Sequence, residues 1–319
     1  MRKLIKFLLL LSIIGLSYIT IKDPTMISRM QDKIAGSIKN EVESNKSKIT
    51  VYYKTADSYV VPLTRIVSSE EAKFDNVINL MTDNEENGKV ASKNGLFPTV
   101  IAGSIKSVKL EDNTAKVELS EKAQFADEQD EKAFIISIVY ALTEFENVDS
   151  VSFEMGDKET LTYGSEMNKL YYRENINEIE KSKNSKSKHT MYIAKKCENV
   201  YNYIPYSVYT DKSDLSLKDI LISHFTMCNM KKYSSMVFAI TANIENVIVK
   251  GESVYIHLSK EFSLMDKAML NLYKNSVALT VKENSDDIKK VRFVIDQNDD
   301  KDGIIETELV NDYSNEERQ

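Results

Sequence analysis

The pair of residues best placed to do chemistry in this sequence is His224 and Cys228, four positions apart. Positions i and i+4 of a helix share one face, so the two side chains could bind one metal ion. Cys197 and His189 would then complete a set of four ligands. No Cys-x-x-Cys spacing is present, however, and a cysteine on an apolar helix face is usually a small buried hydrophobic residue. We therefore predict that His224 and Cys228 are core residues and that the chain holds no metal.

The two cysteines also offer a disulfide. A Cys197–Cys228 bond would persist outside the cytoplasm, but nothing in the sequence fixes the geometry that such a bond requires. Pairing and free thiols are both left open.

A calcium loop is the next candidate, over Asn298–Ile305. Oxygen-bearing side chains at alternate positions, followed by Gly303, imitate the start of such a loop. The first position is Asn298 instead of aspartate, and the twelfth is Leu309, where a bidentate glutamate is needed. We predict a solvated acidic turn after the last strand.

Two serines, Ser120 and Ser259, recur at equivalent positions and could be taken for nucleophiles. Each ends an expected strand just before a polar turn, so we predict that their hydroxyls bond to the local backbone. The sequence contains no Gly-x-Ser-x-Gly elbow, no Gly-x-x-x-x-Gly-Lys loop and no His-Glu-x-x-His motif. A wall hydrolase would need two carboxylates facing each other across a cleft, which sequence cannot place. We predict no enzymatic activity, no catalytic residues and no cofactor.

Composition narrows the class of protein further. The 319 residues are 42% apolar and 29% charged, which suits folded domains and argues against wholesale disorder. The net charge of −7 argues against a nucleic-acid partner. Nine glycines leave little material for loops that cradle phosphates. Two cysteines and three histidines are too few for a disulfide scaffold or for a multi-metal site of soft ligands.

The N-terminus carries a membrane signal. Basic residues flank the 18-residue run Leu4–Ile21, in which Lys6 is the only charge. This length is close to the ~17-residue minimum for crossing a bilayer, so residues 1–24 are predicted to be a signal-anchor helix. The alternative is a cleaved signal peptide, with Gly15 and Ser17 as a weak cleavage site and secretion as the result. In both cases the residues after Asp23 are expected outside the cytoplasm, and an uncleaved helix makes a single-pass protein of the cell membrane.

The segment 25–47 has an apolar residue at about every fourth position, which predicts a helical stalk next to the membrane.

The rest of the chain contains two versions of one pattern. Four apolar positions of the first copy recur 139 residues later without a gap: Ile105, Val108, Val117 and Leu119 become Ile244, Val247, Ile256 and Leu258. Such a repeat indicates a duplicated domain.

Each copy reads as ββαββαβ. In the first copy we expect strands at 49–53 and 60–67 and a helix starting at Ser68 and running through Met81. A polar loop with Gly88 follows, then a hairpin of 105–110 and 115–120, a helix at 134–142 and a strand at 148–155. Pro62 places its strand at a sheet edge.

These elements predict an α+β protein of two tandem domains, each with helices packed on a small mixed sheet. The domains span 48–158 and 188–300. A linker at 159–187 separates them, with the polar stretch Lys181–Lys188 expected to be flexible, and an acidic tail follows at 301–319.

At this point the sequence resembles the GerM domain family of sporulation and spore germination proteins. The resemblance rests on Tyr52-Tyr53, on the run Val60–Arg65, on Val117–Ser120 and on Ser137–Phe145, with a decayed second match at Ile256–Ser259 and Ser276–Thr280. It implies a fold like that of ring-building modules, no enzymatic chemistry and a location outside the cytoplasmic membrane. Family members are often lipoproteins, and this sequence departs from them because no cysteine follows its apolar run.

The resemblance and the residues together predict a non-enzymatic, membrane-anchored scaffold that acts in sporulation or spore germination through protein–protein contacts. Its partners would be envelope or sporulation-complex proteins, or further copies of itself. The alternative is a module that binds peptidoglycan or another wall polymer, suggested by Tyr201, Tyr203, Tyr206 and Tyr209, because aromatic faces stack on sugars.

Overall fold

The computed structural model describes residues 46–74, 76–179, 181–295, 298–306 and 315–318. The signal-anchor prediction for residues 1–24 lies outside this part of the chain, as does the predicted stalk except for residues 46–47. Among the described helices, none is long and apolar enough to span a bilayer. The described residues of 48–66 and those from 70 onward group into one compact unit.

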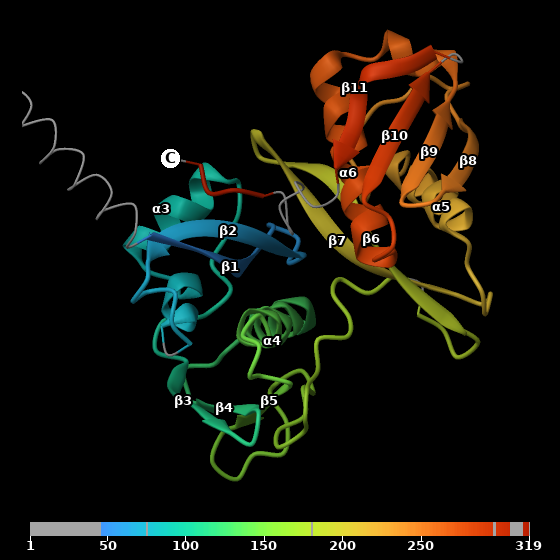
Figure 1. The fold of residues 1–319 in the computed structure, drawn as a ribbon. Helices are drawn as coiled ribbons and strands as arrows, with labels where there is room; N and C mark the ends of the chain where they lie inside the picture. Colours follow the sequence, from blue (N-terminus) through green and yellow to red (C-terminus); the bar gives the residue numbers. More distant parts are fainter. Residues whose placement is uncertain (1–45, 75, 180, 296–297, 307–314, 319) are drawn as a thin grey trace, which may run out of the picture. The chain divides into compact units, whose positions relative to one another are not determined.

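The first half of the chain builds two small sheets and one long helix (Figure 1). Strands β1 and β2 pair with each other, and β3, β4 and β5 form a three-stranded sheet in that order. The bounds are β1 Lys46–Lys54, β2 Val60–Ser68, the 3₁₀ helix η1 Val77–Met81, α3 Glu85–Lys93, β3 Ile105–Glu111, β4 Thr114–Leu119, α4 Glu128–Leu142 and β5 Ser150–Glu154.

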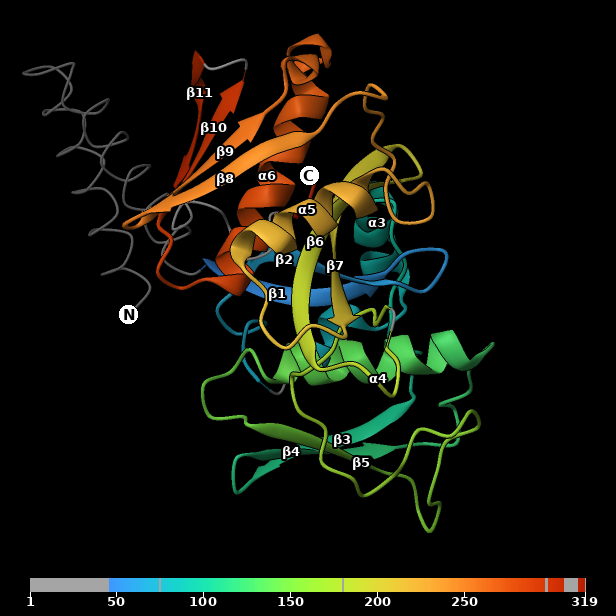
Figure 2. The same cartoon turned by 90° about the vertical axis from the view of Figure 1, so that its right-hand side faces the viewer.

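Local sequence explains the β3–β4–α4–β5 unit. Asp112 and Asn113 join β3 to β4 with φ angles of 48° and 59°, the left-handed pair that a tight hairpin turn requires. Asp127 caps α4 by accepting a hydrogen bond from the backbone N–H of Asp130. Strand β5 runs parallel to β4, so α4 is the crossover, and Figure 2 shows it lying over the β3–β4–β5 sheet.

The second half repeats this plan. Its four-stranded sheet has the order β11-β10-β9-β8, and β6 and β7 form a separate long hairpin. The bounds are β6 Ser187–Cys197, β7 Val200–Thr210, α5 Leu217–Cys228, β8 Ile244–Lys250, β9 Ser253–Leu258, the 3₁₀ helix η2 Lys260–Leu264, α6 Lys267–Asn284, β10 Lys290–Ile295 and β11 Asn298–Glu306.

Strand register confirms that the two halves are copies of one pattern. Ile105 pairs with Leu119 in the first hairpin, and Ile244 pairs with Leu258 in the second. Both ladders shift register directly after this first pair, between Ile105 and Ser107 and at the equivalent place in the other copy. A bulge kept at the same position in both copies is a feature of the fold and not an accident of one loop.

The predicted helix over 68–81 is wrong. Only η1 is helical there, and the α-helix of this region is α3, in the segment predicted to be a polar loop. Asn84 caps α3 by accepting a hydrogen bond from the Asn87 backbone N–H. Two glutamates in the first turn stabilise the helix further, because their negative charge lies at the positive end of the helix dipole. Gly88 is tolerated within this helix.

The acidic turn predicted at Asn298–Ile305 is also wrong, because these residues belong to β11, which pairs antiparallel with β10. The prediction of a flexible stretch at 181–188 is wrong for its last two residues. Ser187 and Lys188 begin β6 and pair with Thr210 and Tyr209. Earlier in the predicted linker, Leu161, Met167, Ile176 and Ile179 are buried, so this part of the connection is packed.

Candidate functional site

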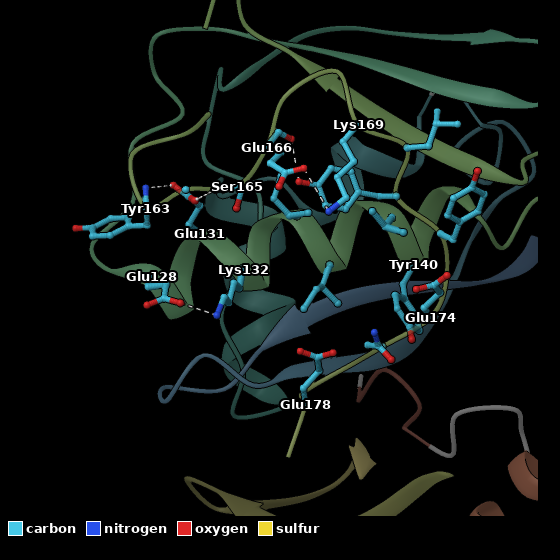
Figure 3. Close-up of a pocket in the computed structure, with 18 of the residues that line it drawn as sticks. Glu128, Glu131, Lys132, Tyr140, Tyr163, Ser165, Glu166, Lys169, Glu174 and Glu178 are labelled. Carbon is cyan, nitrogen blue, oxygen red and sulfur yellow. Dashed lines mark hydrogen bonds and ion pairs between the residues drawn. The ribbon is translucent and has the colours of Figure 1, made fainter. Parts of the chain in front are cut away.

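A groove of about 540 Å³ runs along α4 (Figure 3). Its helical side includes Ile135, Ile136 and Val139, and the segment 163–181 supplies the other wall. Two side chains of this wall, Leu170 and Tyr172, are 47% and 50% exposed. A hollow with aliphatic and aromatic walls and a polar rim is suited to binding a ligand or a protein segment.

Glu131 holds the wall of the groove in place. Its side chain is 1% exposed, and its two carboxylate oxygens accept hydrogen bonds from the backbone N–H groups of Tyr163 (2.8 Å) and Ser165 (2.9 Å). Hydrogen bonds to a charged acceptor are among the stronger ones in proteins. The glutamate therefore positions the 163–165 loop.

Three of the other four carboxylates that line the groove form ion pairs with lysines, and the fourth belongs to Glu174. The ion pairs are Glu128–Lys132 (2.6 Å), Glu166–Lys169 (3.4 Å) and Glu178–Lys181 (2.8 Å). All six side chains are more than a third exposed, so each pair is weak and can be exchanged for contacts with a partner. The rim offers both signs of charge, which suits recognition of a protein surface.

A second cluster surrounds Arg173, at the end of the same segment. Its guanidinium donates to Glu144 Oε1 (2.5 Å) and to the Tyr52 hydroxyl (3.0 Å), and its Cζ lies 4.5 Å from the ring centroid of Tyr140. Tyr52 in turn donates to Glu144 Oε1 at 2.6 Å. A hollow of about 190 Å³ next to this cluster is lined by residues of both halves, among them Thr190 and others of β6.

Two buried asparagines join β2 of the first half to β7 of the second. Asn177 accepts from the Val60 N–H (2.8 Å) and donates to the carbonyls of Val60 (2.7 Å) and Pro205 (2.8 Å). Asn315 accepts from the Tyr203 N–H (2.8 Å) and donates to the carbonyls of Tyr203 (2.8 Å) and Pro62 (2.9 Å). Strands β2 and β7 each contain a proline, which has no N–H to donate to a neighbouring strand. The two side-chain amides supply hydrogen bonds between these strands instead.

The C-terminal residues 315–318 add further contacts beside these asparagines. We call the contacts of Asn177 and Asn315 with β2 and β7, together with those of residues 315–318, the seam. Thr64 donates its N–H to the Asn315 carbonyl (2.7 Å), and Glu317 donates its N–H to Thr64 (2.9 Å). The Glu317 carboxylate also accepts from Nε of Arg65 (3.2 Å), a guanidinium whose side chain is 4% exposed. The end of the chain therefore compensates a buried charge in the first half.

The residues singled out for metal chemistry lie in the core. His224 and Cys228 have no solvent exposure, and Nε2 of His224 lies 3.0 Å from the Tyr192 carbonyl oxygen and 2.8 Å from Ser276 Oγ. Because a carbonyl only accepts, we assign the ring proton to Nε2. Burial lowers the pKa of His224 to about 4, so the ring is neutral at pH 7.

Both cysteines are free thiols, so the Cys197–Cys228 disulfide is not formed in this structure. Burial raises the pKa of each thiol. Across the described ranges, no group of three His, Cys, Asp or Glu side chains could hold a metal ion, and His189 is buried without a hydrogen-bond partner. The side chains of the calcium-like segment at 298–304 lie outside the described part.

The two equivalent serines bond to the local backbone, as predicted. Ser120 Oγ donates to the Gly103 carbonyl (2.6 Å) and accepts from the Lys122 N–H (3.1 Å). Ser259 Oγ accepts from the Asn243 N–H (3.2 Å). The tyrosines proposed to stack on sugars divide into two groups: Tyr203 and Tyr206 are buried, while Tyr201 and Tyr209 are half-buried. The wall-binding alternative loses two of its four residues.

Sequence reasoning missed the residues that shape the groove and the seam. Glu131 lies just before the helix predicted at 134–142, and its partners Tyr163 and Ser165 are more than 30 positions away. Asn177 and Asn315 carry no periodic or motif signal, because their roles depend on the contact between the halves. Pro62 indicates a sheet edge, but nothing in the sequence indicates what covers that edge.

Comparisons with known protein families and solved structures agree with the duplicated fold described above. Residues 50–161 match the family model described as Germane, sporulation and spore germination. The tandem GerMN domains of the sporulation protein GerM from Bacillus subtilis have a similar fold, with a TM-score of 0.59 and 18% identity over 79% of this chain and 92% of that one. The first GerMN domain of the same protein gives a TM-score of 0.35 and 19% identity over 40% and 98%. No curated protein matches the chain.

Proposed function

Since this chain carries a Germane domain within a fold of two tandem GerMN-type domains, we propose that it is a non-enzymatic assembly protein of sporulation or spore germination. The observation that carries this proposal is the Germane match at residues 50–161. The groove supports it, since four of its five carboxylates are bonded to lysines or to backbone amides and its walls carry aliphatic and aromatic side chains.

The same proposal includes anchoring in the cell membrane through residues 1–24, with both domains outside the cytoplasm. It is supported by the uncharged stretch Phe7–Ile21 and its basic flank. The partners would be envelope or sporulation-complex proteins, or copies of this chain. The groove on α4 is the surface that we assign to such a contact.

The test is complementation in a spore-forming host that lacks this chain, with spore yield and spore germination scored separately. Wild type should restore the defective step. The variant Leu170→Glu with Tyr172→Glu places two charges on the groove wall, where the side chains are about half exposed and the fold is little affected. It should be expressed at the wild-type level and fail to restore the step.

The matched control is Val249→Glu, at a side chain 53% exposed on β8 and away from the lining of the groove. It should restore the step as wild type does. A deletion without any defect in spore yield or germination would contradict the proposed function. Full rescue by the double variant would instead contradict the role of the groove. Retention of the full chain on insoluble cell wall, lost with Tyr201→Ala or Tyr209→Ala, would favour the wall-binding alternative.

A further inference from the structure

The groove along α4 carries more negative than positive charge. The charged side chains that line it belong to five glutamates and three lysines, a formal charge of −2. The smaller hollow beside it adds Lys188 and Glu283, one charge of each sign, and Arg173, which is bonded to Glu144. The charges of that hollow therefore do not cancel the excess. A groove of this charge favours a cationic occupant and disfavours a phosphate-bearing polymer or an anionic lipid.

Glu174 is the carboxylate that remains available to such an occupant. Of the five glutamates, it alone forms no side-chain hydrogen bond or ion pair with any residue that the structure describes. Lys188 donates to the backbone carbonyl oxygen of Glu174 and not to its carboxylate. Glu174 and Tyr140 both line the groove and the smaller hollow, so they lie where the two meet (Figure 3).

The side chains next to Glu174 suit a basic residue with an apolar neighbour. The Glu174 N–H donates to the Tyr172 carbonyl oxygen (2.9 Å), so both side chains leave one tight turn. Tyr172 is 50% exposed, and no cation of the described residues lies over its ring. Aromatic faces bind guanidinium and ammonium groups, as the ring of Tyr140 already does with Arg173. Leu170, 47% exposed, offers an aliphatic contact two residues before Tyr172.

We propose that the groove binds a segment of another protein in which a lysine or arginine lies close to an apolar residue. The basic side chain pairs with Glu174 and lies against the ring of Tyr172, and the apolar side chain contacts Leu170. This inference rests on the proposed function, because it names the chemistry of the partner that the groove is assigned to bind. A second copy of this chain fits less well, since its net charge is −7 and its basic stretch Lys181–Lys188 contains no apolar residue.

The experiment presents the full chain, purified in detergent micelles, with a library of short random peptides displayed on phage. Selected peptides should combine a lysine or arginine with an aliphatic or aromatic residue, and acidic residues should be depleted. The peptide that binds most tightly is then synthesised, and its Kd is measured by fluorescence anisotropy. Its affinity should fall as the salt concentration rises, because salt screens an ion pair at an exposed rim.

Charge reversal at Glu174 measures the contribution of this carboxylate. Glu174→Lys should weaken binding of the synthetic peptide about threefold or more, because it removes an ion pair and adds a repulsion. The same peptide with its basic residue changed to glutamate should bind Glu174→Lys more tightly than it binds wild type. The matched control Glu245→Lys makes the same change of charge at an exposed residue of β8, outside the lining of the groove, and should bind as wild type does. Both positions are exposed, so both variants should keep the wild-type urea midpoint.

The outcomes separate this inference from the proposed function. Failure to select any peptide, selection of peptides without basic residues, or equal binding by wild type and Glu174→Lys would overturn the inference and leave the complementation result standing. A deletion strain without a defect would contradict the proposed function, whereas a peptide preference that depends on Glu174 would still support the basic segment as the occupant.

Two other occupants have their own readouts. Self-association of the full chain that Glu174→Lys abolishes would show that a second copy binds in the groove. Retention on insoluble cell wall that the same variant abolishes would show that a wall polymer binds there. Either result would also overturn the inference.

Discussion

At the scale of single residues, the most informative side chain is His224. Its spacing from Cys228 is that of a ligand pair, yet its ring is neutral and bonded to a backbone carbonyl and a serine. The prediction of a core role is confirmed for both residues by their lack of solvent exposure. The sequence could support this because the neighbours at helical spacing, Ile220 and Leu221, are apolar and buried too.

We expect His224 to make the fold sensitive to acid. Its pKa in the folded state, about 4, lies below the ordinary value of 6.5, so the unfolded chain binds a proton that the folded chain excludes. This contribution is fully present above pH 6.5 and falls as the pH drops toward 4, by on the order of 3 kcal/mol. Urea unfolding at pH 7 and at pH 4.5 measures the difference.

The variant His224→Phe should be less stable at pH 7 but should lose less stability between the two pH values. Comparison with wild type is needed because burial also lowers the pKa of His189, which contributes a slope of the same sign. The control Ile222→Ala, at an exposed position of the same helix, changes no titratable group and should keep the wild-type slope. An unchanged slope in His224→Phe would rule out this account of acid sensitivity.

At the scale of elements, the sequence predicted what local pattern determines. The β3–β4 hairpin follows from strict alternation and is found near its expected bounds, while α4 follows from helical spacing and ends where predicted but begins six residues earlier, at Glu128. The helix predicted at 68–81 is an exception, because the structure has η1 at Val77–Met81 and α3 at Glu85–Lys93 instead. The apolar residues Val77, Ile78 and Met81 are buried as expected, but they are buried from a short 3₁₀ turn. Burial alone does not distinguish the two forms of helix.

The wall of the groove could not be predicted for a related reason. Residues 159–179 have neither alternation nor helical spacing, and this composition is typical of a linker. Their order comes from single distant groups, such as the Glu131 carboxylate and the Asn177 amide. The helix that forms one side of the groove was therefore predicted, whereas the groove itself and its other wall were not.

Two glycines give a matched test of how closely the elements approach. Gly95 and Gly156 both have positive φ, +66° and +54°, so alanine strains the backbone at either position by roughly 1–2 kcal/mol. A Cβ atom at Gly95 would lie 2.2 Å from the carbonyl oxygen of Cys197, whereas Gly156 faces open space. Gly95→Ala should therefore cost clearly more stability than Gly156→Ala in urea unfolding. Equal losses would show that the backbones at Gly95 and Cys197 are not in close contact.

The C-terminal residues offer a second test. Asn315→Ala leaves three buried backbone groups of Pro62 and Tyr203 without the partner they have in the native chain, at a cost of about 1–3 kcal/mol for each unsatisfied group. We expect faster hydrogen exchange at the amides of Thr64 and Glu317. Asn184→Ala, in an exposed turn, is the control. Unchanged protection of both amides in Asn315→Ala would contradict a role of this side chain in the seam.

At the scale of the whole molecule, the duplication was readable from sequence because core positions in strands keep their spacing. The contact between the two halves was not readable, since no repeat encodes it. The polar stretch Lys181–Lys188 predicts a flexible connection between the two domains. Instead Asn177, Asn315 and the Asp57–Lys195 ion pair (2.7 Å) tie the halves together within one compact unit.

This coupling predicts one cooperative unfolding transition for both halves. In calorimetry of the full chain, the van't Hoff enthalpy should equal the calorimetric enthalpy for the part that unfolds with the two domains. In Gly95→Ala the transition should broaden or divide, because the close approach at Cys197 is lost. Two well-separated transitions in the wild-type protein would show that the halves unfold independently.

The two prolines at the seam have a consequence for how copies of this chain can associate. Exposed strand edges invite pairing with a neighbouring chain, which is a route to fibres and to exchanged dimers. Here the edges of β2 and β7 are joined by the side-chain amides of Asn177 and Asn315, which donate to the carbonyls of Pro205 and Pro62. A strand from another chain could not form these side-chain hydrogen bonds. The centre of the molecule is therefore closed to strand exchange. Any higher-order array of this protein would have to grow from its outer surfaces, with each copy keeping its own two halves.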